Sequence, residues 1–137
     1  MTKPPRNGIP RHGLDRAFQA EEARKSNLIL EGRALREQRQ DEAAAAKFAE
    51  AAEIEARLSN DCEKAGLAEK FFVHRFSAAS CWAQAGNFYD AIALCQEILD
   101  RPELPSRLHR RVSDYADALR QRRADWYQQV EAADSSP

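Results

Sequence analysis

No proline occurs between Leu14 and Arg101, and this long stretch is rich in Ala, Glu, Arg, Gln and Leu. A proline in a helix interior removes a backbone hydrogen bond and clashes with the preceding turn, so its absence permits long helices. The five abundant residue types lose little entropy in a helix. β-Branched residues are sparse, and no segment alternates apolar and polar side chains over the length of a strand. The sequence therefore predicts an all-α fold.

Breaks in the helical pattern predict five helices in one domain. Gly86 supplies a stop, and Pro102 and Pro105 interrupt the chain before the last helix. The expected helices cover about residues 14–39, 41–66, 67–85, 88–99 and 107–132, with Ser59 as an alternative end of the second. Residues 1–13 are interpreted as a flexible basic arm, 14–133 as a single helical domain and 134–137 as a disordered tail.

The charge balance and the cysteines indicate which partners to expect and where in the cell the protein works. The 137 residues carry 21 Lys and Arg against 22 Asp and Glu, a net charge of −1. This balance disfavours binding to a polyanion, so nucleic acid is not an expected partner. No apolar run approaches the roughly 20 residues that a membrane helix needs, and the first residues do not form a secretory signal. The three cysteines form no close pair, so we expect reduced thiols and a cytoplasmic protein.

The sequence resembles itself after a shift of 47 positions. Small and bulky apolar residues then fall on equivalent ones: Gly32, Leu35, Ala44, Phe48 and Ala51 on Ala79, Trp82, Ala91, Cys95 and Ile98. A small residue lets two antiparallel helices approach closely, and a bulky residue one turn later fills the space beside it. This spacing predicts two helical hairpins of the same kind.

The segment 82–92, with the sequence WAQAGNFYDAI, resembles the helix–turn–helix junction of the tetratricopeptide repeat. Gly86 is similar to the turn glycine of that family, Phe88 to its turn aromatic and Ala91 to its small residue. Three features depart from the family: the period is 47 residues rather than about 34, Arg39 stands where the first turn glycine is expected, and Cys95 is smaller than the usual aromatic. The resemblance implies two divergent tetratricopeptide-like helix pairs with a covering C-terminal helix.

The resemblance also implies a protein-interaction role, because such pairs stack into a curved surface lined by the first helix of each pair. The side chains expected on this inner face are Ile29, Arg33, Arg36, Val73, Phe76 and Ser80. Arginines beside an aromatic ring suit an extended or helical peptide that carries carboxylates. The alternative is structural: Phe76 belongs to the core and the arginines lie on a solvated face.

The last expected helix has two candidate roles. In tetratricopeptide-like proteins a final helix usually covers the exposed face of the last pair. In the alternative, an exposed Trp126 anchors a second copy, and the chain forms a homodimer.

Motifs for catalysis or metal binding are missing from the sequence. The five glycines are isolated, so they form no phosphate loop, and no His or Cys pair has the spacing of a zinc site. His74 lies two turns, about 10.5 Å, before Cys81, which is too far for a direct hydrogen bond. We expect no enzyme activity, no cofactor and no metal, and interpret the chain as an interaction or adaptor module that binds a protein or peptide. The alternative is a dedicated helical regulator of one partner, such as an antitoxin, an immunity protein or a chaperone.

Overall fold

The computed structural model describes residues 14–135, and this part of the chain is all α-helical with no strand. Its five helices are α1 (Arg16–Glu37), α2 (Asp41–Lys64), α3 (Ala68–Gln84), α4 (Phe88–Leu99) and α5 (Ser106–Ser135). The predicted fold class is therefore confirmed. The expected basic arm, residues 1–13, lies outside the described residues, as do residues 136 and 137 of the expected tail.

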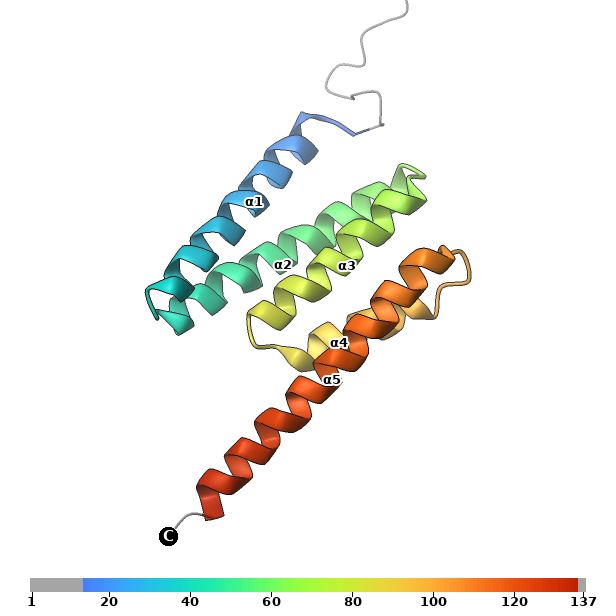
Figure 1. Ribbon diagram of the computed structural model, residues 1–137. Helices are drawn as coiled ribbons and strands as arrows, with labels where there is room; N and C mark the ends of the chain where they lie inside the picture. The colour runs from blue at the N-terminus through green and yellow to red at the C-terminus, as the bar shows by residue number, and fades with distance from the viewer. Residues whose placement is uncertain (1–13, 136–137) are drawn as a thin grey trace, which may run out of the picture.

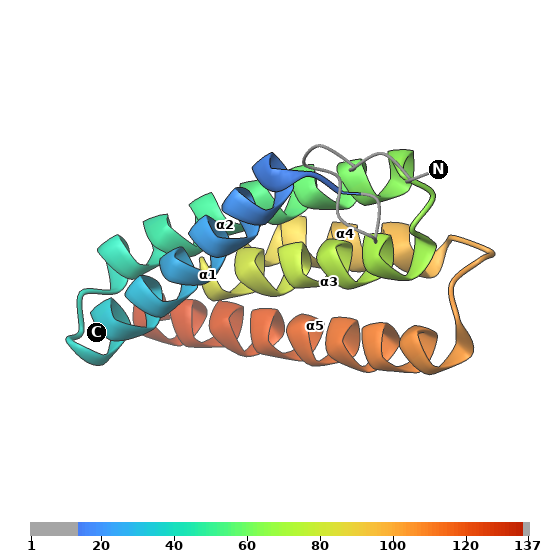
Figure 2. The same cartoon turned by 90° about the horizontal axis from the view of Figure 1, so that it is seen from above.

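Successive helices run antiparallel and form a short two-row stack (Figure 1). α1 and α2 form the first pair, α3 and α4 the second, and α5 lies along the second pair. Viewed from above, α1, α3 and α5 form one row, while α2 and α4 lie behind them (Figure 2). The arrangement is two helix pairs with a C-terminal covering helix.

The small residues of the two hairpins lie where the helices pack most closely. Ala44, Ala51, Ala79 and Ala91 are fully buried. A Cβ atom placed on Gly32 would lie only 2.8 Å from Cε2 of Phe48, so glycine is what allows α1 to approach the buried Phe48 ring on α2.

The three connections between α1 and α4 share one turn. Each contains a residue with positive φ: 62° at Arg39, 75° at Gly66 and 85° at Gly86. In each, the next amide donates to the carbonyl five residues earlier, as in the bond from Asn87 N to Trp82 O at 2.9 Å. This is the helix ending that glycine favours, and Arg39 adopts it at the position where a turn glycine was expected.

α2 continues without a break to Lys64, so Ser59 does not end it. The Ser59 side chain is buried, and its hydroxyl donates to the carbonyl of Ala56 at 2.7 Å. That bond satisfies the hydroxyl inside the helix, which removes its capacity to act as a stop signal.

The two halves of α5 differ in burial. Leu108, Val112, Ala116 and Leu119 are buried, so the first half covers the second helix pair. The helix then continues past the ends of α3 and α4 (Figure 1), and every residue from Ala124 to Asp134 is exposed. It includes residues 134 and 135, which the sequence analysis placed in the tail, because no glycine or proline stops it there.

None of the helices in residues 14–135 is both long enough and apolar enough to span a membrane.

Candidate functional site

The structure does not gather the six side chains expected on the inner face into one open surface. Ile29 is half-buried and packs against the core, whereas Arg33 and Val73 are exposed. Arg36 is held within the chain: its guanidinium donates to Oε1 of Gln84 at 2.7 Å and lies 4.8 Å from the centre of the Phe48 ring. This arginine joins the end of α1 to the end of α3.

Phe76 and Ser80 face α5. The Phe76 ring packs edge-on against Tyr115 of α5, with the ring centres 5.3 Å apart. Burial raises the pKa of the Tyr115 hydroxyl, and a hydrogen bond with Ser80 acts in the opposite direction. Both residues therefore make contacts with the covering helix. Of the expected set, Arg33, Arg36 and Val73 are exposed, and Arg36 is tied to Gln84.

A hollow lies beside the part of α5 that projects past α3 and α4, and we call it the notch. Its volume is about 840 Å³, within the range typical of ligand sites. It is lined by Arg36, Asp41 and Ala45 of the first helix pair, by residues 84–89 around the α3–α4 turn, and by Arg123, Trp126 and Tyr127 of α5. It exists because α5 continues beyond the point at which the α3–α4 hairpin turns back.

Exposed aromatic side chains surround the notch. The exposed fractions are 75% for Tyr89, 52% for Trp126 and 55% for Tyr127. Trp126 and Tyr127 contact each other edge to face, with the ring centres 5.2 Å apart, and Phe88 lies under the guanidinium of Arg122 at 5.3 Å. Exposed aromatic groups of this kind mark surfaces that bind another molecule.

The polar groups of the notch are of both signs. Arg123 and Arg36 contribute positive charge, and Asp41 at the start of α2 contributes negative charge. The notch thus combines apolar anchors with a mixed polar rim, the usual anatomy of a protein-binding surface.

A second cluster is buried between α1, α2 and α3. Glu55 is 1% exposed, and its carboxylate lies 2.7 Å from Nδ1 of His74 and 3.4 Å from Nζ of Lys25. Glu22 lies 3.7 Å from the other ring nitrogen of His74, and the ring packs edge-on against Phe18 at 5.6 Å. Among the described residues no group of His, Cys, Asp and Glu side chains is arranged to hold a metal ion. The contacts of this cluster join α1, α2 and α3.

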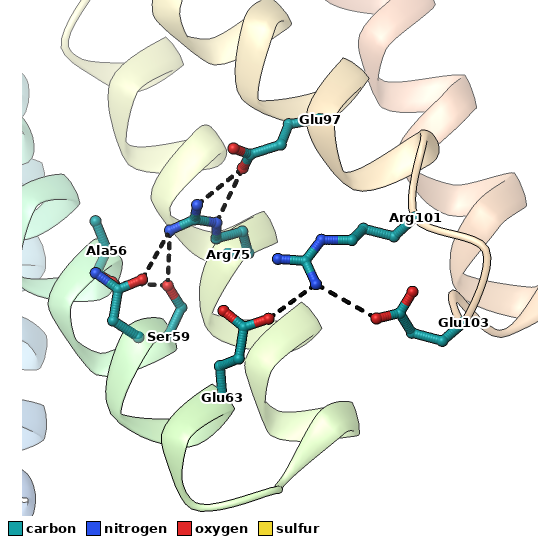
Figure 3. A network of polar contacts seen from close by, with 8 residues as sticks. Ala56, Ser59, Glu63, Arg75, Glu97, Arg101 and Glu103 are labelled. Carbon is teal, nitrogen blue, oxygen red and sulfur yellow. Dashed lines mark hydrogen bonds and ion pairs between the residues drawn. The ribbon is translucent and has the colours of Figure 1, made fainter.

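Two arginines tie the first helix pair to the second on its other side (Figure 3). Arg75 contacts Glu97 of α4 at 2.9 Å and donates to the Ser59 hydroxyl of α2 at 3.1 Å. Arg101 lies 2.8 Å from Glu63, and this hydrogen bond lowers the pKa of the Glu63 carboxyl. These charged groups bind one another and are structural.

The three cysteines are free and buried. Burial raises the pKa of the Cys62, Cys81 and Cys95 thiols to about 11. Since the thiolate is the reactive form, this raised pKa lowers the reactivity of the three thiols in the folded chain.

Comparison with protein-family models, with curated proteins and with solved structures gives no match for this chain. The notch differs from the face expected from sequence: Trp126 was the only one of its exposed aromatic side chains singled out for a binding role. The signal for it was present, because Trp126 and Val130 continue the apolar stripe of α5 beyond the length of the twelve-residue α4.

Proposed function

We propose that this chain is a non-enzymatic protein-interaction or adaptor module that binds a helix or an extended peptide in the notch. The observation that carries the proposal is the exposure of Tyr89, Trp126 and Tyr127 around one hollow of about 840 Å³. Each ring leaves a large apolar surface in water, and its burial against a partner is favourable by about 25 cal/mol per Å².

The lining indicates what kind of occupant fits. Apolar side chains of the partner would pack on the aromatic rings, while Arg123 and Asp41 at the edge would pair with a carboxylate and an ammonium or guanidinium group, respectively. Arg36 adds positive charge, although its hydrogen bonds to Gln84 reduce its freedom to bind a partner.

The same proposal treats the two hairpins as divergent tetratricopeptide-like units. Its support is the burial of the small residues that the repeat makes equivalent, Ala44 in the first hairpin and Ala79 and Ala91 in the second. In this interpretation the binding site lies at the end of the stack rather than on its inner face. The three reduced, buried thiols fit a cytoplasmic location.

The proposal is tested by a double substitution, Trp126→Ala with Tyr127→Ala, compared with Leu30→Ala as the control. Leu30 is a similarly exposed apolar residue, 60% accessible, on α1 and outside the notch. Proteins retained by each immobilised variant are identified, and each is then purified and titrated by calorimetry. Interface hot spots contribute at least about 2 kcal/mol, so we expect the double variant to bind at least about thirtyfold more weakly.

The proposal is contradicted if the wild type, the double variant and the Leu30→Ala control bind every retained protein equally. It is also contradicted if no retained protein depends on the notch. The number of proteins retained distinguishes the two forms of the function. Several proteins indicate an adaptor, and a single protein indicates a dedicated regulator.

A further inference from the structure

The projecting half of α5 is a helix whose side chains have little of their own chain to pack on. We call residues 120–134 the α5 tail. Every residue from Ala124 to Asp134 is exposed, including Trp126, Tyr127 and Val130. A helix of this length is marginal in water by itself, so packing against another surface would stabilise it.

Charges on the α5 tail are arranged symmetrically about Tyr127. Arg123 and Glu131 each lie four residues from Tyr127, and Arg120 and Asp134 each lie seven residues from it. Because a helix turns once every 3.6 residues, these five side chains lie along one face. The apolar Ala124 and Val130, each three residues from Tyr127, lie on the same face.

The remaining charges of the α5 tail point elsewhere. Arg122 lies over the Phe88 ring, and Asp125 accepts a hydrogen bond from Gln121 at 2.9 Å. Within the described chain Arg123, Glu131 and Asp134 make no ion pair, whereas Arg120 contacts Asp117 at 3.2 Å and donates to Oε1 of Gln96 in α4 at 3.3 Å. The face centred on Tyr127 thus has an apolar middle flanked by Arg123 on one side and Glu131 on the other, and both of these charges lack an ion-pair partner among the described residues.

We propose that the occupant of this face is a second copy of the chain, bound antiparallel about a two-fold axis at Tyr127. In that arrangement Arg123 meets Glu131 of the second copy, and Arg120 meets its Asp134. A parallel arrangement would bring like charges together. The contact between identical surfaces in a symmetric dimer requires this palindromic pattern, which an unrelated partner would not require.

The inference rests on the proposed function, because it takes the α5 wall of the notch as a protein-binding surface. Tyr127 and Arg123 belong both to that wall and to the paired face. The second copy would therefore lie against the notch.

The experiment is a charge exchange on the full-length chain, followed by sedimentation equilibrium over a wide range of concentration. Arg123→Glu and Glu131→Arg each place like charges opposite each other in the dimer, and we expect either one to weaken dimerisation about tenfold. The double variant restores opposite charges, so its dimerisation constant should return close to that of the wild type. Arg122→Glu is the control, since it makes the same change one residue away and off the paired face.

A second measurement reports the position of the axis. A residue on a two-fold axis lies next to its own copy, so Tyr127→Cys should form a disulfide-linked dimer under mild oxidation. Gln129→Cys, two residues further and off this face, should not. The natural thiols do not compete, because burial raises their pKa to about 11.

A wild-type chain that stays monomeric, or a dimer that the single charge changes leave intact, overturns the antiparallel pairing. In either case, a different protein that still binds through Trp126 and Tyr127 leaves the proposed function standing. If the double alanine variant also binds every retained protein as the wild type does, the proposed function fails as well.

Discussion

Replacing Gly32 with alanine should destabilise the chain, although alanine is the better helix former. In a helix interior the change gains about 1 kcal/mol from propensity. The new Cβ, however, would lie 2.8, 3.0 and 3.1 Å from three carbon atoms of the Phe48 ring. Carbon atoms pack best at about 3.5–4.0 Å, so the ring must move.

The Phe48 ring has little room to move. It is 1% exposed, and the guanidinium of Arg36 covers it at 4.8 Å from the ring centre. Overpacking a tight core costs about 1–3 kcal/mol. After subtraction of the propensity gain we expect Gly32→Ala to lower the free energy of unfolding by about 1 kcal/mol, measured by urea denaturation with circular dichroism. The corresponding fall in Tm is about 4 °C.

The same substitution should change the free energy of unfolding in the opposite direction when a smaller residue replaces Phe48. In a Phe48→Leu background the added methyl group has space, so Gly32→Ala should stabilise by up to about 1 kcal/mol. The coupling energy of the double-mutant cycle is then about 1–2 kcal/mol. Gly32→Ala that stabilises the wild-type chain, or a coupling near zero, would refute the close crossing of α1 and α2.

Three further predictions concern a turn, the buried charge cluster and the thiols. Arg39→Gly should raise the free energy of unfolding by about 1 kcal/mol in urea titrations, because φ is 62° there, whereas Gly86→Ala should lower it by a similar amount. Glu55→Ala should cost about 3–5 kcal/mol by the same assay, because it removes the buried carboxylate that contacts both Lys25 and His74. Stability should fall as pH rises from 9 to about 11, because burial raises the pKa of each thiol from 9.0 to about 11 and the folded chain keeps protons that the unfolded chain releases. Replacing all three cysteines with alanine should flatten that slope in urea titrations at several pH values.

The order and the ends of the helices followed from local signals. Two prolines before α5 and the glycine after α3 act on the residues next to them, so the sequence predicted these boundaries within a few residues. The 47-residue shift relates only the α1–α2 and α3–α4 turns, so it does not predict that the α2–α3 turn has the same form. Gly66 has a positive φ, as Gly86 does, and this glycine was the sequence signal for a turn of the same kind.

Glu55 is buried although its charge predicts an exposed position. A glutamate in a helix rich in glutamate is usually solvated. Yet Ala51, Glu55, Leu58 and Cys62 recur at steps of four, three and four, and all of them are buried on one face of α2. The spacing therefore indicated burial. Its partners, Lys25 and His74, come from other helices, and no local pattern specifies such pairings.

The apolar stripe of α5 indicated part of the notch, but its position also depends on which helices α5 covers, and no local pattern specifies that. α5 packs chiefly along α4, and its Tyr115 also contacts Phe76 of α3, which covers part of the face expected to bind a peptide. Beyond these contacts α5 extends past α3 and α4 (Figure 1), and the notch lies beside that extension.

The buried and the exposed residues of α5 contribute differently to the stability of the folded chain. Leu108, Val112 and Leu119 are buried and contribute to folding, whereas Trp126 and Tyr127 remain more than half exposed on the same helix. An exposed ring removes little apolar surface from water, so its truncation should cost the folded monomer little. Since these rings add little to the stability of a single chain, their large apolar surfaces gain free energy mainly by contact with another molecule. We therefore propose that the projecting half of α5 binds a partner and that the covered half stabilises the fold.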